Sequence, residues 1–315
     1  MAVGPEITVV VPTLGRRTSL LRAVERLLAQ ADAPPFELLI VRDAAADGEH
    51  VGEAIARMPA DSPAMSWRLL EATRPGASAA RNAGWREATA PLVLFVDDDV
   101  LAGPGLLRRH VEAHAAHPET EVAVLGLVTW ARELRVTPFM RWLEQGIQFD
   151  YGAITGPEAD IGKFTTANLS LKRVLLADSG GFDEVRFPYL WEDIELGWRL
   201  SHRGLRLRYE PRAFAEHLHQ VDVDAYLERM RLVARGERRL VETHPELEAQ
   251  LYDRFRAALA RPAPHGRGAR LAHLVPEATP WLGPRVWASA AAVFERRLAG
   301  PYVEAFDEAS KPGGS

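Results

Sequence analysis

The alternation of two periodicities along the first 130 residues most constrains the fold. Apolar, β-branched runs such as residues 7–13 and 91–97 are typical of buried strands, and leucines at helical spacing fill residues 16–31. Strands that alternate with helices pair in parallel through right-handed crossovers. The sequence therefore predicts an α/β domain with a predominantly parallel sheet flanked by helices, whose ligands gather at the carboxyl ends of the strands.

The same signals predict the remaining elements of this domain. Further strands are expected at residues 36–43, 66–72, 121–130, 165–173, 205–211 and 213–219. Helices are expected at residues 49–58, 76–88, 138–146 and 192–204. Residues 150–163 are rich in Gly, Pro and acid, which predicts a loop able to order over a bound ligand.

The pattern changes near residue 222. Residues 1–221 are predicted to form the α/β domain, and residues 222–315 a helical C-terminal extension whose end, from about residue 308, is disordered. Arginines mixed with an apolar face leave three roles open for the extension. It could complete a substrate site, form a homodimer interface or lie on a membrane surface, in addition to ordinary packing.

Composition excludes several classes of protein. The net charge of −5 gives no sign of nucleic-acid binding. The chain has no cysteine, so its fold uses no disulfide and no thiolate metal site. No apolar segment approaches the roughly 20 residues that a membrane span requires, and the N-terminus does not resemble a signal peptide. We therefore expect a cytoplasmic protein, with contact to the inner face of the membrane as an alternative.

Three consecutive aspartates, Asp97, Asp98 and Asp99, follow a buried apolar strand. Neighbouring carboxylates repel one another and are costly to bury. Because alternate strand residues face the same side, Asp97 and Asp99 are predicted to converge, and a divalent cation would relieve their repulsion. Carboxylates suit Mg²⁺ or Mn²⁺, which also bind substrate phosphates. The alternative for these three residues is a solvated acidic loop. Asp43 also stands at the carboxyl end of a predicted strand, so we expect it in the same crevice at this edge of the sheet.

Six segments, in this order and spacing, resemble the family 2 glycosyltransferases, which have the GT-A fold. They are VVVPTLGR (9–16), IVRDAAADG (40–48), GASAARNAG (76–84), LFVDDDV (94–100), GGFDE (180–184) and WEDIELGWR (191–199). The resemblance covers roughly residues 5–220. It implies an inverting, metal-dependent enzyme that moves a sugar from a nucleoside-diphosphate sugar, UDP-linked by preference, to a hydroxyl of a saccharide, a lipid-linked molecule or a small molecule.

The resemblance also implies which residues bind the donor. Asp97 and Asp99 would hold Mn²⁺ or Mg²⁺, and the nucleotide would contact Pro12, Thr13, Asp43, Arg81, Asp97 and Asp98. Asp43 would accept a hydrogen bond from the base, Arg81 would face the diphosphate and Asp98 the ribose. The chain departs from the family at Arg42, which replaces a first acid, and at Ala44, which replaces a Gly, so the base is less determined. A turn carboxylate is the alternative for Asp43.

For the acceptor side, the resemblance implies that Asp193 is the general base, with Trp191 and Glu192 beside the acceptor. A base must lie within hydrogen-bond reach of the hydroxyl it deprotonates. Acids in the first turn of a helix also complement its dipole, which is the alternative for Glu192 and Glu195. Trp191 is equally compatible with a place in the core.

The resemblance further implies a third metal ligand from a histidine about two dozen residues after the Glu-Asp pair. His217 fits that position, and a neutral imidazole suits Mn²⁺. His219 is a weaker candidate, and a purely structural histidine is the alternative for both.

Two other functions remain open from the sequence. A nucleotide-sugar-binding protein without turnover would tolerate Arg42 and Ala44. A sugar nucleotidyltransferase would share the architecture but would want a Gly-rich, Lys-containing phosphate loop after the first strand, which residues 11–18 match poorly.

Overall fold

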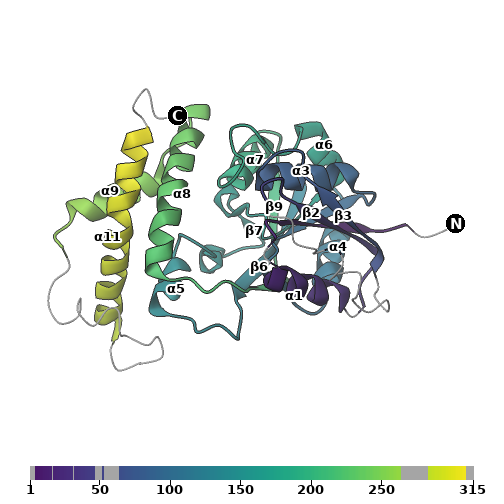
Figure 1. Cartoon of the computed structure of the whole chain (residues 1–315), viewed down its shortest axis with the longest axis horizontal. Helices are drawn as coiled ribbons and strands as arrows, with labels where there is room; N and C mark the ends of the chain where they lie inside the picture. Colours follow the sequence, from purple (N-terminus) through teal and green to yellow (C-terminus); the bar gives the residue numbers. More distant parts are fainter. Residues whose placement is uncertain are drawn as a thin grey trace. The chain divides into compact units, whose positions relative to one another are not determined.

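A computed structural model describes residues 4–15, 17–30, 32–46, 52, 64–263 and 283–309. The chain forms two compact units (Figure 1). One comprises Met1–Leu134 and Tyr151–His219 and carries the sheet; the other comprises Arg135–Asp150 and Gln220–Ser315 and is helical. Of the predicted helix at residues 49–58, only residue 52 is described. The part of the predicted disordered tail beyond residue 309 lies outside the described residues.

The sheet unit contains one mixed sheet, in the order β3-β2-β1-β4-β8-β6-β9-β5, with β7 paired to β9. The strands are β1 (Ile7–Thr13), β2 (Phe36–Arg42), β3 (Ala64–Glu71), β4 (Leu92–Val96), β5 (Val100–Ala102), β6 (Val122–Trp130), β7 (Glu158–Ala159), β8 (Asn168–Lys172) and β9 (Arg206–His217). Strands β3, β2, β1 and β4 are parallel, as predicted. β8 is inserted antiparallel to both β4 and β6, so the other half of the sheet is mixed.

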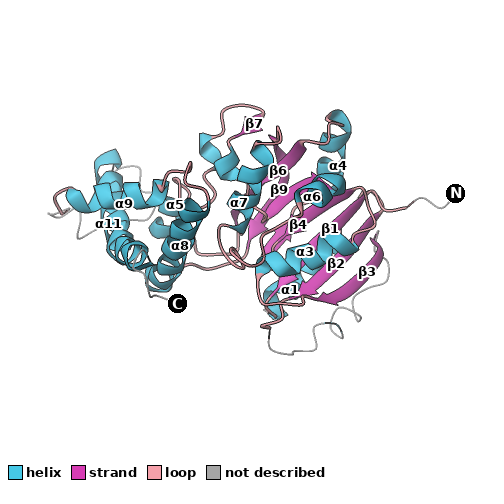
Figure 2. Cartoon of the chain, turned by 90° about the horizontal axis from the view of Figure 1, so that it is seen from above, coloured by secondary structure: helices cyan, strands magenta, loops and turns pink. Residues whose placement is uncertain are grey.

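Helices cover both faces of the sheet. They are α1 (Arg17–Leu28), α3 (Ala77–Glu87), α4 (Leu106–Ala116), α6 (Arg173–Ser179) and α7 (Glu192–Ser201). Along β1, Val10 packs in one apolar cluster with Trp85 of α3, whereas Val9 and Val11 pack in another with Leu20 of α1. This two-residue alternation is the one expected of a strand buried on both faces. Figure 2 shows α3 and α6 over one face.

Several elements differ from the prediction. α4, α6 and the short β5 were not predicted; the buried face of α4 includes His110 and His114, which weakens its hydrophobic periodicity. The two strands predicted at residues 205–211 and 213–219 form the single strand β9. Residues 150–163, predicted as a loop, contain two short 3₁₀ turns and β7.

A buried chain of hydrogen bonds joins α4 to β8. Lys172 Nζ lies 3.2 Å from His114 Nδ1, His114 Nε2 lies 2.9 Å from Ser170 Oγ, and Ser170 Oγ lies 2.8 Å from His110 Nδ1. His110 Nε2 lies 2.9 Å from Asn168 Oδ1. Burial lowers the pKa of His110 to about 4 and that of His114 to about 3, so both rings are neutral near pH 7.

Asn168 ends this chain where β6 and β9 change register. Its amide donates to the carbonyl oxygens of Leu127, at 3.3 Å, and Ala213, at 2.8 Å. The register shifts between Gly126 and Leu127, and a Cβ at Gly126 would lie 2.2 Å from Asn168 Nδ2. Asn168 therefore holds the irregularity that precedes the last residues of β9, which end at His217.

Asn168→Ala is expected to lower the free energy of unfolding of the sheet unit by about 3 kcal/mol, because it leaves buried donors and acceptors without partners. Denaturant unfolding followed by fluorescence measures this change. Thr155→Ala, at an exposed loop position of the same unit, is the control and should change stability little. Equal stability of the two variants would contradict the assigned role of Asn168.

The helical unit consists of α5 (Pro138–Leu143), α8 (Val223–Thr243), α9 (Gln250–Ala260) and α11 (Gly283–Ala309). Phe139 of α5 meets the ring of Tyr226 edge-on at 5.6 Å and that of Phe294 at 5.3 Å between centroids. Residues 135–150, predicted within the 1–221 domain, thus group with the helical unit because α5 buries its aromatic face there.

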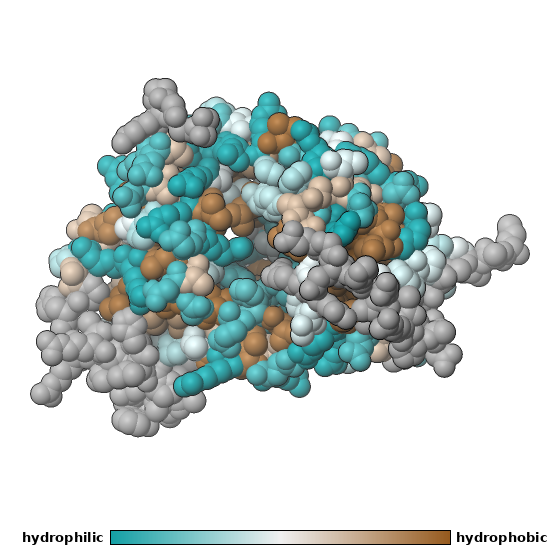
Figure 3. Space-filling view, viewed as in Figure 1, coloured by the Kyte–Doolittle hydropathy of each residue, from teal (hydrophilic) through white to brown (hydrophobic). Residues whose placement is uncertain are grey.

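The apolar faces of α8 and α11 are also buried inside the helical unit, through residues such as Met230 and Leu298. On the face shown in Figure 3, hydrophilic side chains are interspersed with hydrophobic ones over the described part of this unit. Among the helices that the structure describes, none is both long and apolar enough to cross a membrane.

Candidate active site

The acidic run forms a turn between two strands. β4 ends at Val96, and the backbone N–H of Val100 donates to the carbonyl oxygen of Asp97 at 3.0 Å. Because residues 97–99 are not extended, strand alternation does not direct Asp97 and Asp99 to a common point. Each of the three aspartate side chains instead meets a different part of the sheet unit.

Asp97 is bound by Arg81, which also binds Glu192. Arg81 Nη2 donates to Asp97 Oδ1 at 2.9 Å, and Arg81 Nη1 donates to Glu192 Oε1 at 2.7 Å. The side chains of Arg81 and Glu192 are buried, whereas that of Asp97 is 30% exposed. One guanidinium from α3 therefore joins the acid run after β4 to the acid pair that opens α7.

The second carboxyl oxygen of Glu192 does not take part in this network. Glu192 Oε2 is buried and has no hydrogen-bond partner among the described residues. Burial raises the pKa of Glu192 to about 7, and the Arg81 guanidinium opposes that rise. When Glu192 is ionised, this oxygen can accept a hydrogen bond from a substrate hydroxyl.

Asp98 faces the first strand. Thr13 Oγ1 donates to Asp98 Oδ2 at 2.6 Å, and the backbone N–H of Gly15 donates to Thr13 Oγ1 at 3.0 Å. Pro12 and Thr13 were both predicted to contact the nucleotide, and they are the last two residues of β1, where Thr13 meets Asp98.

Asp99 lies beside His217. His217 Nε2 is 3.4 Å from Asp99 Oδ1, with side-chain exposures of 12% and 7%. The pairing of β5 with β9 fixes this geometry, because Val100 stands opposite His217 and the N–H of Leu218 donates to the carbonyl of Asp99 at 2.6 Å. The weaker candidate, His219, has its ring 5.8 Å from that of His217.

The Asp99–His217 pair fits two ligands of one divalent cation. Within the described residues, no group of three or more His, Asp or Glu side chains is arranged to hold a metal. Mg²⁺ and Mn²⁺ are commonly held by one or two protein ligands and complete their coordination with phosphate oxygens and water. The residues present therefore suit a cation that binds together with a phosphorylated substrate.

Asp43 ends β2 with its carboxylate engaged by three donors. Oδ1 accepts from the N–H of Ala45 at 2.8 Å; Oδ2 accepts from the N–H of Gly76 at 2.9 Å and from the hydroxyl of Tyr189 at 2.8 Å. The hydrogen bond from Ala45 makes Asp43 a turn carboxylate, which is the alternative role predicted for it from the sequence. Tyr189 was not singled out in the sequence, where no motif distinguishes it from a core tyrosine.

Asp193 sits at the start of α7, after two strained residues. Leu190 and Trp191 have φ of 62° and 66°, which is unfavourable for side chains of this size and is typical of functional sites. Asp193 accepts from the N–H of Ile194 at 2.8 Å and of Thr166 at 3.4 Å. Burial raises the pKa of Asp193, with Arg81 opposing, which strengthens it as a base. Trp191 is half-buried.

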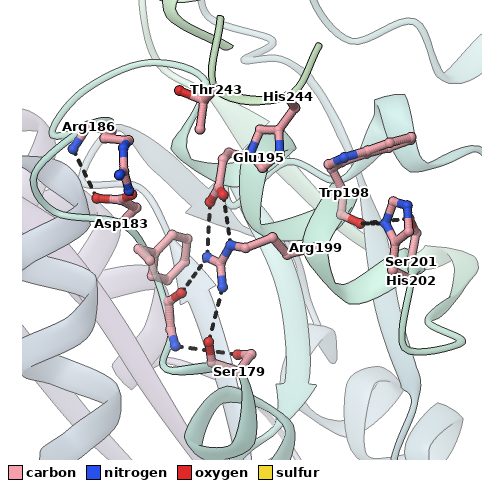
Figure 4. A network of polar contacts seen from close by, with 12 residues as sticks. Ser179, Asp183, Arg186, Glu195, Trp198, Arg199, Ser201, His202, Thr243 and His244 are labelled. Carbon is pink, nitrogen blue, oxygen red and sulfur yellow. Dashed lines mark hydrogen bonds and ion pairs between the residues drawn. The ribbon is translucent and has the colours of Figure 1, made fainter. Parts of the chain in front are cut away.

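Glu195 points into a separate network (Figure 4). Its two oxygens accept from Arg199 Nε at 2.7 Å and Arg199 Nη2 at 2.9 Å. Arg199 also donates to the carbonyl oxygens of Ser179, at 3.0 Å, and Gly181, at 2.6 Å. These contacts anchor α7 to the end of α6 and the following turn.

Comparison with known sequences identifies one family. A family model described as "Glycosyltransferase like family 2" matches residues 5–235. Validoxylamine A glucosyltransferase of Streptomyces hygroscopicus subsp. limoneus is 28% identical over 284 residues, covering 79% of this chain and 59% of the relative. Pre-mycofactocin glycosyltransferase of Mycobacterium tuberculosis is 29% identical over 179 residues, covering 56% and 37%. The chain thus spans about three fifths of the length of the former relative and less of the latter.

Solved structures share the fold. The mannosyltransferase PcManGT from Pyrobaculum calidifontis, in complex with GDP-Man and Mn²⁺, superposes with a TM-score of 0.61 at 20% identity, covering 96% of this chain and 88% of the other. Residues 1–349 of TarS from S. aureus, in complex with UDP, give a TM-score of 0.53 at 17% identity, covering 96% and 91%. At this identity the likeness concerns the fold.

Proposed function

Because the chain belongs to the family 2 glycosyltransferases, we propose that it is an inverting, metal-dependent enzyme that transfers a sugar from a nucleoside-diphosphate sugar to an acceptor hydroxyl. The observation that carries this proposal is the position of Arg81. Its guanidinium contacts both Asp97 and Glu192, so the donor-side acids and the Glu192–Asp193 pair belong to one site.

On the donor side, Asp99 and His217 would hold Mn²⁺ or Mg²⁺ together with the diphosphate. A bound cation stabilises the negative charge that develops on the departing diphosphate. Asp98 and Thr13 would orient the ribose, and Asp43 the base. Positioning of the two substrates by these side chains supplies much of the rate enhancement of such a reaction.

On the acceptor side, Asp193 removes the proton of the attacking hydroxyl. The acceptor oxygen forms a bond to the anomeric carbon while the bond from that carbon to the diphosphate oxygen breaks, and in-line attack inverts the configuration. Glu192 Oε2 accepts a hydrogen bond from another acceptor hydroxyl, and Trp191 lies beside the sugar. The raised pKa of Asp193 suits a base that must capture a proton in the transition state.

Product analysis tests the proposal. With Mn²⁺ and a series of UDP- and GDP-sugars, the protein is expected to release the nucleoside diphosphate, and EDTA should abolish the release. Release of pyrophosphate from a sugar phosphate and a nucleoside triphosphate would instead indicate a nucleotidyltransferase. Binding of nucleotide sugars without any release, across acceptors, would indicate a binding protein without turnover.

The family resemblance favours a UDP-sugar, and the named relatives and fold neighbours span glucosyl and mannosyl transfer and both UDP and GDP. A saccharide, a lipid-linked molecule and a small molecule all remain candidate acceptors, and the helical unit is the part of the chain proposed to contact the acceptor, a second copy or a membrane surface.

A further inference from the structure

Tyr189 donates a side-chain hydrogen bond to Asp43, and neither the family resemblance nor the proposed mechanism gives it a role. We propose that Tyr189 is a specificity-determining residue. Its hydroxyl occupies one oxygen of Asp43, so Asp43 offers a single acceptor atom and selects a nucleobase with one imide N–H, as in uracil or thymine. This inference rests on the proposed function, in which Asp43 faces the base.

The number of acceptor positions on Asp43 is limited. An ionised carboxylate has about four lone-pair positions, two on each oxygen. Gly76 and Tyr189 fill both positions of Oδ2, and Ala45 fills one of Oδ1. Among the residues that the structure describes, no donor occupies the second position of Oδ1. Asp43 is only 3% exposed, so hydrogen bonds to its carboxylate are little weakened by water.

The backbone just before Tyr189, which is 39% exposed, is hydrogen-bonded to the start of α3. The buried Phe187 accepts a hydrogen bond from Ser78 Oγ through its carbonyl, and the carbonyl of Pro188 accepts one from the N–H of Ser78 at 3.2 Å. Gly76 has φ of 135°, and a Cβ there would lie 2.8 Å from the oxygen of Pro188. The close approach of these two backbones sets Tyr189 beside Asp43.

The direction of the Tyr189 hydrogen bond is determined by chemistry. An ionised carboxylate only accepts, so the phenol must donate. Burial and the neighbouring Asp43 raise the pKa of Tyr189 to about 12, which keeps the phenol protonated throughout the physiological range. The second acceptor position of Oδ2 is therefore occupied whenever Tyr189 holds this position.

This arrangement discriminates between bases. Guanine presents two adjacent N–H groups that pair with both oxygens of an open carboxylate, whereas uracil and thymine present one N–H at N3. With Tyr189 in place, one guanine N–H would find no acceptor on Asp43, so guanine would lose the second hydrogen bond to the carboxylate. The chain is therefore expected to prefer UDP to GDP.

Calorimetric titration of UDP and GDP, each with Mn²⁺, tests the inference on the full chain. Wild type is expected to bind UDP at least about 10-fold more tightly than GDP, and Tyr189→Phe to narrow that ratio by about 10-fold, the effect of one hydrogen bond to a charged group. Tyr252→Phe is the matched control, because it removes a tyrosine–aspartate hydrogen bond of the same length, 2.8 Å to Asp307, in the helical unit. The ratio of UDP affinity to GDP affinity in Tyr252→Phe should equal that of wild type.

A second measurement needs no variant. A uridine diphosphate methylated at N3 lacks the imide N–H and should bind wild type about 10-fold more weakly than UDP. Equal binding of the methylated nucleotide, a preference of wild type for GDP, or an unchanged UDP-to-GDP affinity ratio in a folded Tyr189→Phe would each overturn the role of Tyr189. None of these results would contradict glycosyl transfer itself. Failure of wild type to bind either nucleotide would overturn the proposed function, and this inference with it.

Discussion

Asp193→Asn is expected to lower kcat by about 1000-fold, within the range that a general base contributes. The amide cannot take the proton of the acceptor hydroxyl, but it preserves the size of the side chain, and its one oxygen can still accept from the N–H of Ile194, the shorter of the two bonds to Asp193. Affinity for the nucleotide donor and for Mn²⁺ should therefore stay close to wild type. Steady-state kinetics on the acceptor, combined with calorimetric titration of the nucleotide, separates these two effects.

The control for this variant is Asp178→Asn, at an exposed position near the end of α6, which should retain full activity.

The pH dependence of the wild-type enzyme gives a second test of Asp193. Because burial raises the pKa of Asp193, the acidic limb of kcat/KM should lie above the ordinary aspartate pKa of about 3.9, and activity should fall as the pH drops through it. Glu192 lies next to Asp193 and titrates together with it, so the apparent pKa of this acidic limb describes the two carboxyl groups jointly. Full activity of Asp193→Asn would remove this residue as the base.

Asp99→Ala is expected to weaken Mn²⁺-dependent binding of the nucleoside diphosphate by at least about 100-fold, since even residues that only support a metal ligand contribute 10- to 100-fold. Nucleotide binding measured in EDTA should change far less, because Asp98, Thr13 and Asp43 are left in place. Titrations with and without Mn²⁺, compared with those of Asp178→Ala, isolate the metal-dependent part.

His217→Ala should parallel Asp99→Ala if both side chains hold the same cation. If they do, the Mn²⁺-dependent nucleotide affinity of the double variant should be little lower than that of either single variant, because the first substitution already removes the shared interaction. Losses that simply add would show that Asp99 and His217 act separately, and the proposed cation site would then be wrong. The 3.4 Å between the two side chains makes this cycle a direct test.

The local sequence determined much of the fold. The structure has strands β1, β2, β3, β4 and β6 and helices α1, α3 and α7 where the periodicity predicts them. Each of these elements buries an apolar face, and its apolar spacing follows from that burial. The parallel half of the sheet follows from the same alternation. The family resemblance, carried by short motifs at the ends of these elements, led to the glycosyltransferase family before any contact was known.

Only the tertiary structure decided which side chains of the site contact one another. Thr13 meets Asp98 across 85 residues of sequence, Arg81 meets Glu192 across 111, and Asp43 meets Tyr189 across 146. Such pairs arise from the packing of whole elements, which leaves no periodic signal in either segment.

The same reason explains the antiparallel β8 and the grouping of α5 with the helical unit. Residue type and spacing thus determined which side chains could do chemistry. The packing of distant segments determined which of them meet: Asp97 with Arg81, Asp98 with Thr13, and Asp99 with His217.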